Sequence, residues 1–368
     1  MMDNWSHCTN LLIIRPDNIG DVLMSSPAIG AIKRRFGSKI TLLTSEAGAT
    51  ASTLLPEVDE TLVANFPWAK HDSSVSAAHL SGLMSHLKSA AFDGCIIFTV
   101  YSQNPLPTAM LAWAAGIPRR LAYCRENPYE LLTHWVPDDE PYARVRHQVV
   151  RDLDLAERIG AYTNDDRITL TVPDDANVQA MVKLSRVGVD VGRPFVIFHA
   201  AVSEPKRVFP LERWVALARR FLIDHPTQQV LFTGGSADRV LTDQLCRLCG
   251  PRTFSVGGLL TIAEFAGVIR QAALVVSVNT AAMHLAAALG RPLVVLYALT
   301  NPQHTPWRCP HVLFPYSVAE KSLQSRNEVI RYVDRSLYRE KVNLPATDEV
   351  LDAINGLLNR QGESQLVC

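Results

Sequence analysis

Short runs of apolar residues alternate with longer amphipathic stretches in the first half of the chain. The runs 11–14, 40–43 and 95–98 are typical of buried strands, while residues 22–36 and 77–91 have the apolar spacing of helices. Strands separated by helices of this length predict β-α-β units and a parallel sheet.

The same alternation returns in the second half of the chain. It predicts four strands and four helices, the strands at 195–198, 230–232, 274–276 and 293–296 and the helices at 211–223, 240–249, 261–270 and 281–289. Residues 319–343 are charged and show no clear period. A last helix is predicted at 348–359, after Pro345.

The two series predict an α/β fold of two doubly wound, Rossmann-like domains that face each other across a cleft. A chain of 368 residues is too long for one ordinary core and fits two domains. We expect domains at 1–172 and 194–318, joined by a linker at 173–193 that carries one amphipathic helix. Residues 319–368 are expected to form an irregular segment and a C-terminal helix that packs back on the N-terminal domain.

Charge and cysteine content narrow the class of protein. The chain has 36 basic and 36 acidic residues, so it lacks the basic excess typical of nucleic-acid binding. Its seven cysteines do not suit a secreted disulfide framework, and Cys246-x-x-Cys249 has no second pair to complete a zinc site. The start of the chain does not resemble a signal peptide, and no run approaches the about 18 apolar residues of a membrane span. These features predict a cytoplasmic protein that meets a membrane, if at all, only peripherally.

The loop from Arg15 to Asp21 follows the first predicted strand and opens the first helix. It lacks the G-x-G-x-x-G and P-loop patterns, so the common dinucleotide and triphosphate sites are not indicated. Ligands of open α/β sheets collect at such loops, and Asp21 directly follows a glycine there. Asp21 is therefore a candidate general base for a sugar hydroxyl. The alternative is that Asp21 only complements the helix dipole in the first turn.

A second candidate loop precedes the predicted helix at 281–289. Asn279 is suited to cap this helix, which would leave the N–H groups of Thr280, Ala281 and Ala282 to bind an anion such as the diphosphate of a nucleotide-sugar. His284 lies on the same helix and is a further candidate. The alternatives are that Asn279 only caps the helix and that His284 is a packed helix histidine.

Weaker candidates follow two other strands of the second half. Asp238, after Gly234-Gly235, is placed to accept hydrogen bonds from ribose hydroxyls, although a simple tight turn explains the glycines equally well. Lys206 lies in a loop after a strand, where it is either a phosphate ligand or an ordinary surface lysine.

The densest basic runs lie at 119–125 and 144–151 and are candidates to bind an anionic acceptor. Acidic residues at 138–140 and 152–154 favour a mixed, solvated surface as the alternative.

Three stretches together resemble one family. They are I-I-R-P-D-N-I-G-D-V-L-M-S-S-P-A-I at 13–29, A-A-G-I-P-R-R-L-A-Y at 114–123, and the long stretch 256–297, which contains V-V-S-V-N-T-A-A-M-H-L-A-A-A-L-G. In order and spacing over about residues 11–310, the chain resembles the ADP-heptose:lipopolysaccharide heptosyltransferases, glycosyltransferase family nine, whose fold is the two-Rossmann-domain GT-B type.

The resemblance implies an inverting glycosyltransferase with Asp21 as catalytic base and with no requirement for a metal or other cofactor. It assigns acceptor binding to the N-terminal domain, with Arg119 and Arg120 facing a phosphorylated acceptor. It assigns donor binding to the C-terminal domain, where the implied donor-binding residues are Lys206, Asp238 near the ribose, Leu260 against adenine, and Asn279, Thr280, Ala281 and His284.

The chain departs from the family where Asp-Ser/Thr-Gly is usual and Asn279-Thr280-Ala281 stands instead. We expect heptosyl transfer from ADP-heptose to a hydroxyl of an anionic lipopolysaccharide inner-core acceptor. The alternatives are transfer to a soluble small molecule or a protein, and an inactive donor-binding protein, which the loss of the acid at Asn279 suggests. A sugar-nucleotide epimerase of GT-B shape is a remoter alternative.

Overall fold

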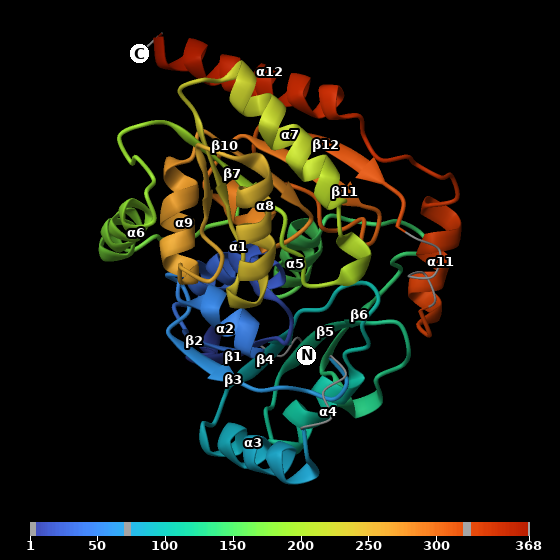
Figure 1. The fold of residues 1–368 in the computed structure, drawn as a ribbon. Coiled ribbons are helices and arrows are strands. Elements are labelled where there is room, and N and C mark those ends of the chain that lie inside the picture. The colour runs from blue at the N-terminus through green and yellow to red at the C-terminus, as the bar shows by residue number, and fades with distance from the viewer. Residues whose placement is uncertain (1–4, 70–74, 319–324, 367–368) are drawn as a thin grey trace. The chain divides into compact units, whose positions relative to one another are not determined.

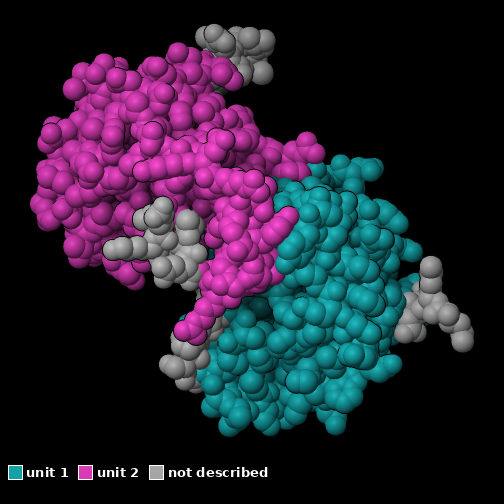
Figure 2. All heavy atoms as spheres, turned by 90° about the vertical axis from the view of Figure 1, so that its right-hand side faces the viewer, with its two compact units in different colours: residues 1–171 teal, residues 172–368 magenta. Residues whose placement is uncertain are grey.

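The computed structural model describes residues 5–69, 75–318 and 325–366. The chain divides into two compact units, unit 1 at residues 1–171 and unit 2 at residues 172–368 (Figure 2). Each unit is built on its own six-stranded, all-parallel sheet with helices around it (Figure 1).

The strand order of unit 1 is β3-β2-β1-β4-β5-β6, the doubly wound order of a Rossmann fold. Its central strands are buried runs of Leu, Ile and Cys, as expected for strands covered on both faces. The strands are β1 (Asn10–Arg15), β2 (Lys39–Thr44), β3 (Glu60–Val63), β4 (Gly94–Ile97), β5 (Arg120–Cys124) and β6 (His134–Pro137). The helices are α1 (Ile19–Phe36), α2 (Glu46–Ser52), α3 (Ala77–Ser89), α4 (Leu106–Ala114) and α5 (Gln148–Glu157).

Unit 2 repeats this architecture. Its sheet has the order β12-β11-β10-β7-β8-β9, which is again the doubly wound order when its strands are counted along the chain. The strands are β7 (Phe195–His199), β8 (Gln229–Phe232), β9 (Thr253–Ser255), β10 (Leu274–Val278), β11 (Leu293–Ala298) and β12 (His311–Tyr316). The helices are α6 (Asp174–Arg186), α7 (Leu211–Asp224), α8 (Arg239–Cys249), α9 (Ile262–Gln271), α10 (Ala281–Ala288), α11 (Glu328–Leu337) and α12 (Thr347–Leu366).

The strand order reverses direction between β1 and β4 in unit 1 and between β7 and β10 in unit 2. Loops that leave the carboxyl ends of such neighbouring strands separate and form the crevice in which doubly wound sheets bind ligands. We therefore expect the ligand-binding residues of each unit in the loops at these two points.

Two expected boundaries are wrong. Helix α6 belongs to unit 2 and packs against α9, with Lys183 paired to Glu264 at 2.7 Å, so residues 173–193 are not merely a linker. The C-terminal helix α12 packs beside α7 on the sheet of unit 2 rather than on the N-terminal domain (Figure 1). Its buried side chains join the core of unit 2 because they recur at helical spacing, at Val350, Leu351, Ile354 and Leu357.

Part of the stretch 319–343, expected to be irregular, is helical. Residues 328–337 form α11, which Asn327 caps by accepting a hydrogen bond from the N–H of Val329 at 2.9 Å. Residues 319–324 lie outside the described part of the chain. In the described residues, no helix combines the length and the apolar composition needed to cross a membrane.

Candidate active-site residues of the two units

The crevice of unit 1 holds two aspartates on one buried arginine. Arg15 ends β1, and its guanidinium contacts Asp17 through Nε at 3.1 Å and Asp21 through Nη2 at 3.2 Å. The Arg15 side chain is fully buried, whereas those of Asp17 and Asp21 each keep 12% exposure. Burial alone would lower the pKa of Arg15, but the charges of Asp17, Asp152 and Asp21 raise it, so the guanidinium stays ionised.

Asp21 fills the third position of α1 and has a structural role there. Its Oδ2 accepts a hydrogen bond from the N–H of Asn18 at 3.2 Å, which closes the first turn of the helix. Asp21 therefore lies in the first turn of α1, as the alternative interpretation expects. The carboxylate is also partly exposed and held by Arg15, so the two roles are compatible.

Asp152, which was not among the predicted site residues, lies near enough to the same arginine for the two charges to interact. It is buried in α5, where Ser25 Oγ and Gln148 Nε2 each donate a hydrogen bond to it at 2.7 Å. Burial raises the pKa of Asp152 to about 6, although the nearby charge of Arg15 acts in the opposite direction. No motif marks this residue, because only the packing of α5 on α1 brings it to Arg15.

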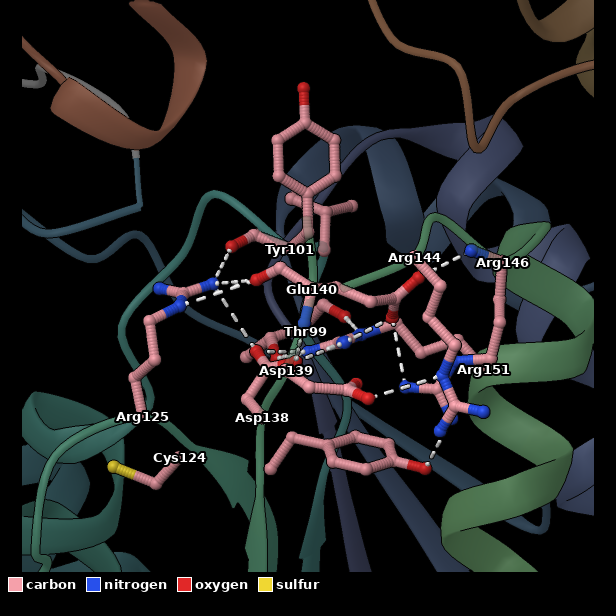
Figure 3. A network of polar contacts seen from close by, with 12 residues as sticks. Thr99, Tyr101, Cys124, Arg125, Asp138, Asp139, Glu140, Arg144, Arg146 and Arg151 are labelled. Atoms are coloured by element: carbon pink, nitrogen blue, oxygen red, sulfur yellow. Dashed lines mark hydrogen bonds and ion pairs between the residues drawn. The ribbon is translucent and has the colours of Figure 1, made fainter. Parts of the chain in front are cut away.

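The basic run at 144–151 forms a buried ionic network, not the expected solvated surface. Arg151 contacts the carboxylates of Asp138 and Glu140 at 2.8 and 2.5 Å, and Arg146 contacts Glu140 at 2.9 Å. Figure 3 shows these side chains gathered in one network. Arg151 Nε also donates to the carbonyl of Thr99 at 2.9 Å, which ties α5 to the loop after β4. These ion pairs connect α5 to the loops that follow β4 and β6. Arg146 and Arg151 are paired with carboxylates of the protein itself.

Two further arginines border the network. Arg125 donates to the carbonyls of Tyr101 and Glu140, the latter at 2.7 Å (Figure 3). Arg144 contacts Asp139 at 3.3 Å, and its side chain remains 56% exposed. Arg144 is thus an accessible cation at the carboxyl edge of the sheet.

Arg119 and Arg120 do not join this site. Both lie at the start of β5, the amino edge of the sheet, whereas Asp21 follows the carboxyl end of β1. Arg120 is buried, and its guanidinium donates to the backbone carbonyls of Ile117, Glu130 and Leu131. This placement corrects the expectation that the pair faces the acceptor, and we exclude both residues from the proposed site.

In unit 2, Asn279 follows β10 but does not cap α10. Its Nδ2 donates to the carbonyl of Ala298 at 3.0 Å, and its Oδ1 accepts from the N–H of the same residue at 3.1 Å, which fastens β10 to the end of β11. The N-cap residue is Thr280, whose own N–H donates to the carbonyl of Val278 at 2.8 Å. The expected capping by Asn279 and the expected anion-binding N–H of Thr280 are therefore wrong. Ala281 and Ala282 keep first-turn positions, where N–H groups lack intrahelical acceptors.

The two hydrogen bonds to Ala298 need an amide, which gives a structural reason for asparagine at position 279 where the family usually has aspartate. In Asn279→Asp, a carboxylate oxygen replaces the donor and faces the carbonyl of Ala298 in a buried site. We expect this variant to lower the free energy of unfolding by about 1–2 kcal/mol, measured by urea denaturation. Asn164→Asp, which adds the same charge at an exposed position, is the control. Equal midpoints for the two variants would contradict the proposed role of the amide.

Lys206 lies in the short turn Pro205–Arg207, after β7 and near Asn279. Its Nζ pairs with Glu204 at 2.8 Å, and its side chain is 36% exposed. The neighbouring Arg207, which the sequence analysis did not select, donates to the carbonyl of Asn279 at 3.0 Å and to Glu204 at 2.8 Å. The turn thus places two cations beside the loop that leads into α10.

The glycine loop after β8 contacts the loop before α9. The N–H of Gly258 donates to the carbonyl of Gly234 at 3.0 Å, and Asp238 Oδ2 accepts from the N–H of Gly235 at 2.8 Å. A Cβ atom on Gly234 would lie 2.6 Å from that of Asp238, so this turn requires glycine. The tight-turn interpretation is therefore correct for Gly234. Asp238 and Leu260 stay partly exposed on these two loops.

Two histidines of unit 2 are held in the crevice region. His284 is buried in α10, with its ring 6.2 Å from that of His304, as the packed-histidine alternative expects. His199, another residue without a sequence signal, ends β7 and lies 2.8 Å from Thr233 Oγ1. Burial lowers the pKa of His199 to about 4, so its ring is neutral at pH 7. Across the described ranges, no group of three or more His, Cys, Asp or Glu side chains is arranged to hold a metal ion.

Comparisons with known proteins agree on one family. A family model described as glycosyltransferase family 9 (heptosyltransferase) matches residues 82–336. Lipopolysaccharide heptosyltransferase 2 of Escherichia coli is 24% identical over 313 residues, which cover 80% of this chain and 84% of the relative.

Two solved structures are similar over nearly their whole length. A family 9 glycosyl transferase from Veillonella parvula superposes with a TM-score of 0.77 at 17% identity and covers 98% of this chain and 99% of its own. The E. coli ADP-heptose LPS heptosyltransferase II superposes with a TM-score of 0.72 at 20% identity, covering 96% and 99%. These likenesses confirm the predicted fold of two Rossmann-like domains.

Proposed function

The chain belongs to glycosyltransferase family 9, and from this premise we propose that it transfers a heptosyl residue from ADP-heptose to a hydroxyl of a lipopolysaccharide inner-core acceptor. That it is a glycosyltransferase of GT-B fold follows from the family and from the two doubly wound sheets. The donor and the acceptor are the proposal, and the names of the relatives support them.

One observation carries the assignment of the base. Asp21 is a carboxylate with 12% of its side chain exposed, held by an ion pair with buried Arg15 after the carboxyl end of β1. In the proposed reaction, Asp21 takes the proton of the acceptor hydroxyl while that oxygen attacks the anomeric carbon of the donor. The bond from this carbon to the diphosphate breaks, and ADP leaves from the opposite face, so the anomeric configuration inverts.

The donor is proposed to bind unit 2. The leaving diphosphate gains negative charge during the reaction, and Lys206, Arg207 and the first turn of α10 are the groups that would stabilise it. Asp238 is proposed to bind the ribose, with Leu260 near adenine. His284 is 4% exposed, and we assign it a packing role beside this site rather than a contact with the donor. No cofactor is included in this mechanism.

An acceptor panel tests the proposal. We expect purified protein to move label from ADP-heptose onto lipopolysaccharide isolated from strains that lack inner-core heptoses, and not onto soluble sugars or proteins. Label on soluble acceptors alone would favour the second candidate function, transfer to a small molecule or a protein. Absence of any turnover, with donor binding retained, would instead favour an inactive donor-binding protein. Sedimentation of the protein with vesicles of the same lipopolysaccharide would test peripheral membrane contact.

A further inference from the structure

The crevice of unit 1 contains a second carboxylate whose position matches that of the base. Asp17 and Asp21 contact neighbouring nitrogens of one guanidinium, Nε and Nη2 of Arg15, and their side chains are exposed to the same extent. The two carboxylates therefore lie side by side at the carboxyl edge of the sheet. Asp17 Oδ2 is buried against Arg15, so the 12% exposure of this side chain belongs to its other atoms.

Asp17, in the loop after β1, is held by residues of the loops after β4 and β2. Gln103, in the loop after β4, donates from Nε2 to Asp17 Oδ1 at 2.6 Å, and its Oε1 accepts from the N–H of Val100 at 3.0 Å. Ser45 Oγ donates to the backbone carbonyl of Asp17 at 2.5 Å. The backbone of Asp17 is thus held from the end of β2, and its carboxylate is oriented by Gln103 and Arg15. A recognition group needs such a fixed position.

Balancing the charge of Arg15 does not require Asp17. Arg15 has Asp21 on one side, and the charge of Asp152 also acts on it. With Asp17, three carboxylates act on the guanidinium of Arg15, although the charge of Arg151 also acts on Asp152. Carboxylates placed close together in a buried site repel one another. Arg15 Nε and Nη1 are buried and donate a hydrogen bond to no described residue. The contact of Nε with Asp17 is therefore an ion pair without a hydrogen bond. Carboxylate oxygens in fixed positions beside the proposed base are suited to bind a ligand with several hydroxyl groups, which donate hydrogen bonds.

We propose that Asp17 is an acceptor-binding residue, which accepts a hydrogen bond from the sugar hydroxyl next to the one that Asp21 deprotonates. The acceptor class is a sugar with two neighbouring hydroxyls, since a carboxylate accepts several hydrogen bonds and donates none. Phosphate groups of the acceptor are excluded from this spot by the surrounding carboxylates and bind elsewhere. This inference rests on the proposed role of Asp21.

The test separates acceptor recognition from structure and from base catalysis. Asp17→Ala is assayed with labelled ADP-heptose and heptose-deficient lipopolysaccharide, and in parallel for hydrolysis of the donor without acceptor. We expect the acceptor KM to rise about 10- to 100-fold, the size of a lost hydrogen bond to a charged group, while the donor KM and the hydrolysis rate stay within about two-fold. Asp93→Ala is the matched control, because Asp93 accepts from the N–H groups of Thr9 and Asn10 at the opposite edge of the sheet.

Three outcomes would overturn the proposal, two from the kinetic assay and one from a binding experiment. An unchanged acceptor KM would remove Asp17 from the acceptor site, and an equal fall in transfer and hydrolysis would show that it only supports Arg15 and Asp21. Saturation-transfer NMR with methyl α-D-mannopyranoside, a monosaccharide with neighbouring hydroxyls, gives an answer independent of ADP-heptose. Binding by the wild type and by Asp93→Ala but not by Asp17→Ala would support the inference even if heptosyl transfer failed. No binding by the wild type would contradict it.

Discussion

Replacement of Asp21 by asparagine is expected to lower the rate of heptosyl transfer by about 100- to 10,000-fold, the usual contribution of a general base. The amide keeps the size of the side chain and an oxygen that can accept from the N–H of Asn18, so α1 still begins at Ile19. It cannot take the proton of the acceptor hydroxyl. The affinity for ADP, measured by calorimetry, is expected to change by no more than a few-fold, because the nucleotide is proposed to bind the other unit.

The structural role of Asp21 requires a control that changes only a helix cap. Ser76 caps α3 in the same unit by accepting from the N–H of His79 at 3.2 Å. Ser76→Ala is expected to cost about 1 kcal/mol of stability and to leave the transfer rate intact. If Asp21→Asn lost stability like Ser76→Ala and kept its activity, Asp21 would only close the first turn of α1 and would not be a base.

Replacement of Arg151 by methionine is expected to destabilise unit 1 by about 3–5 kcal/mol, the cost of leaving buried charges without their partner. Arg151 is fully buried, and it is the side chain that contacts Asp138 and Glu140 together with the carbonyl of Thr99 (Figure 3). Urea denaturation of the full chain should show a lower midpoint. Hydrogen exchange should accelerate first in β4, β6 and α5, whose loops the arginine joins.

An exposed arginine of the same run is the control for this experiment. Arg144 pairs with Asp139 at the surface, and loss of such a pair costs about 0–1 kcal/mol. Arg144→Met is therefore expected to unfold near the wild-type midpoint. A midpoint for Arg151→Met as high as that of Arg144→Met would mean that the buried network contributes little to the stability of unit 1.

The central strands of both sheets could be predicted because each is a continuous apolar run. Such a run is visible in the sequence without knowledge of the neighbouring strand. The runs 11–14, 40–43 and 95–98 became β1, β2 and β4. Residues 120–124 and 134–137 did not stand out, although they form β5 and β6, since the apolar runs that follow Arg120 and His134 are short. Strands near a sheet edge are recognised by the neighbour with which they pair, and that pairing is tertiary.

The position of the C-terminal helix illustrates the same limit. Its apolar spacing predicted a helix at 348–359, and the structure has α12 there. The surface that receives this helix could not be inferred, because its apolar face would suit any complementary groove. The choice of α7 and the sheet of unit 2 depends on shapes that a single sequence does not display.

The local order of residues determined that this chain forms two doubly wound sheets, and it predicted candidate site residues in the loops after β1, β7 and β10. Periodicity and loop residues act over a few positions, so they can be recognised along the sequence. Only the tertiary structure decided which charges serve one another and which face outward. It places Arg119 and Arg120 at the amino edge of the sheet, bonds Asn279 to Ala298, and brings Asp152 of α5 near Arg15. The physical reason is that a buried charge is defined by its partners, and those partners come from segments that are distant in sequence.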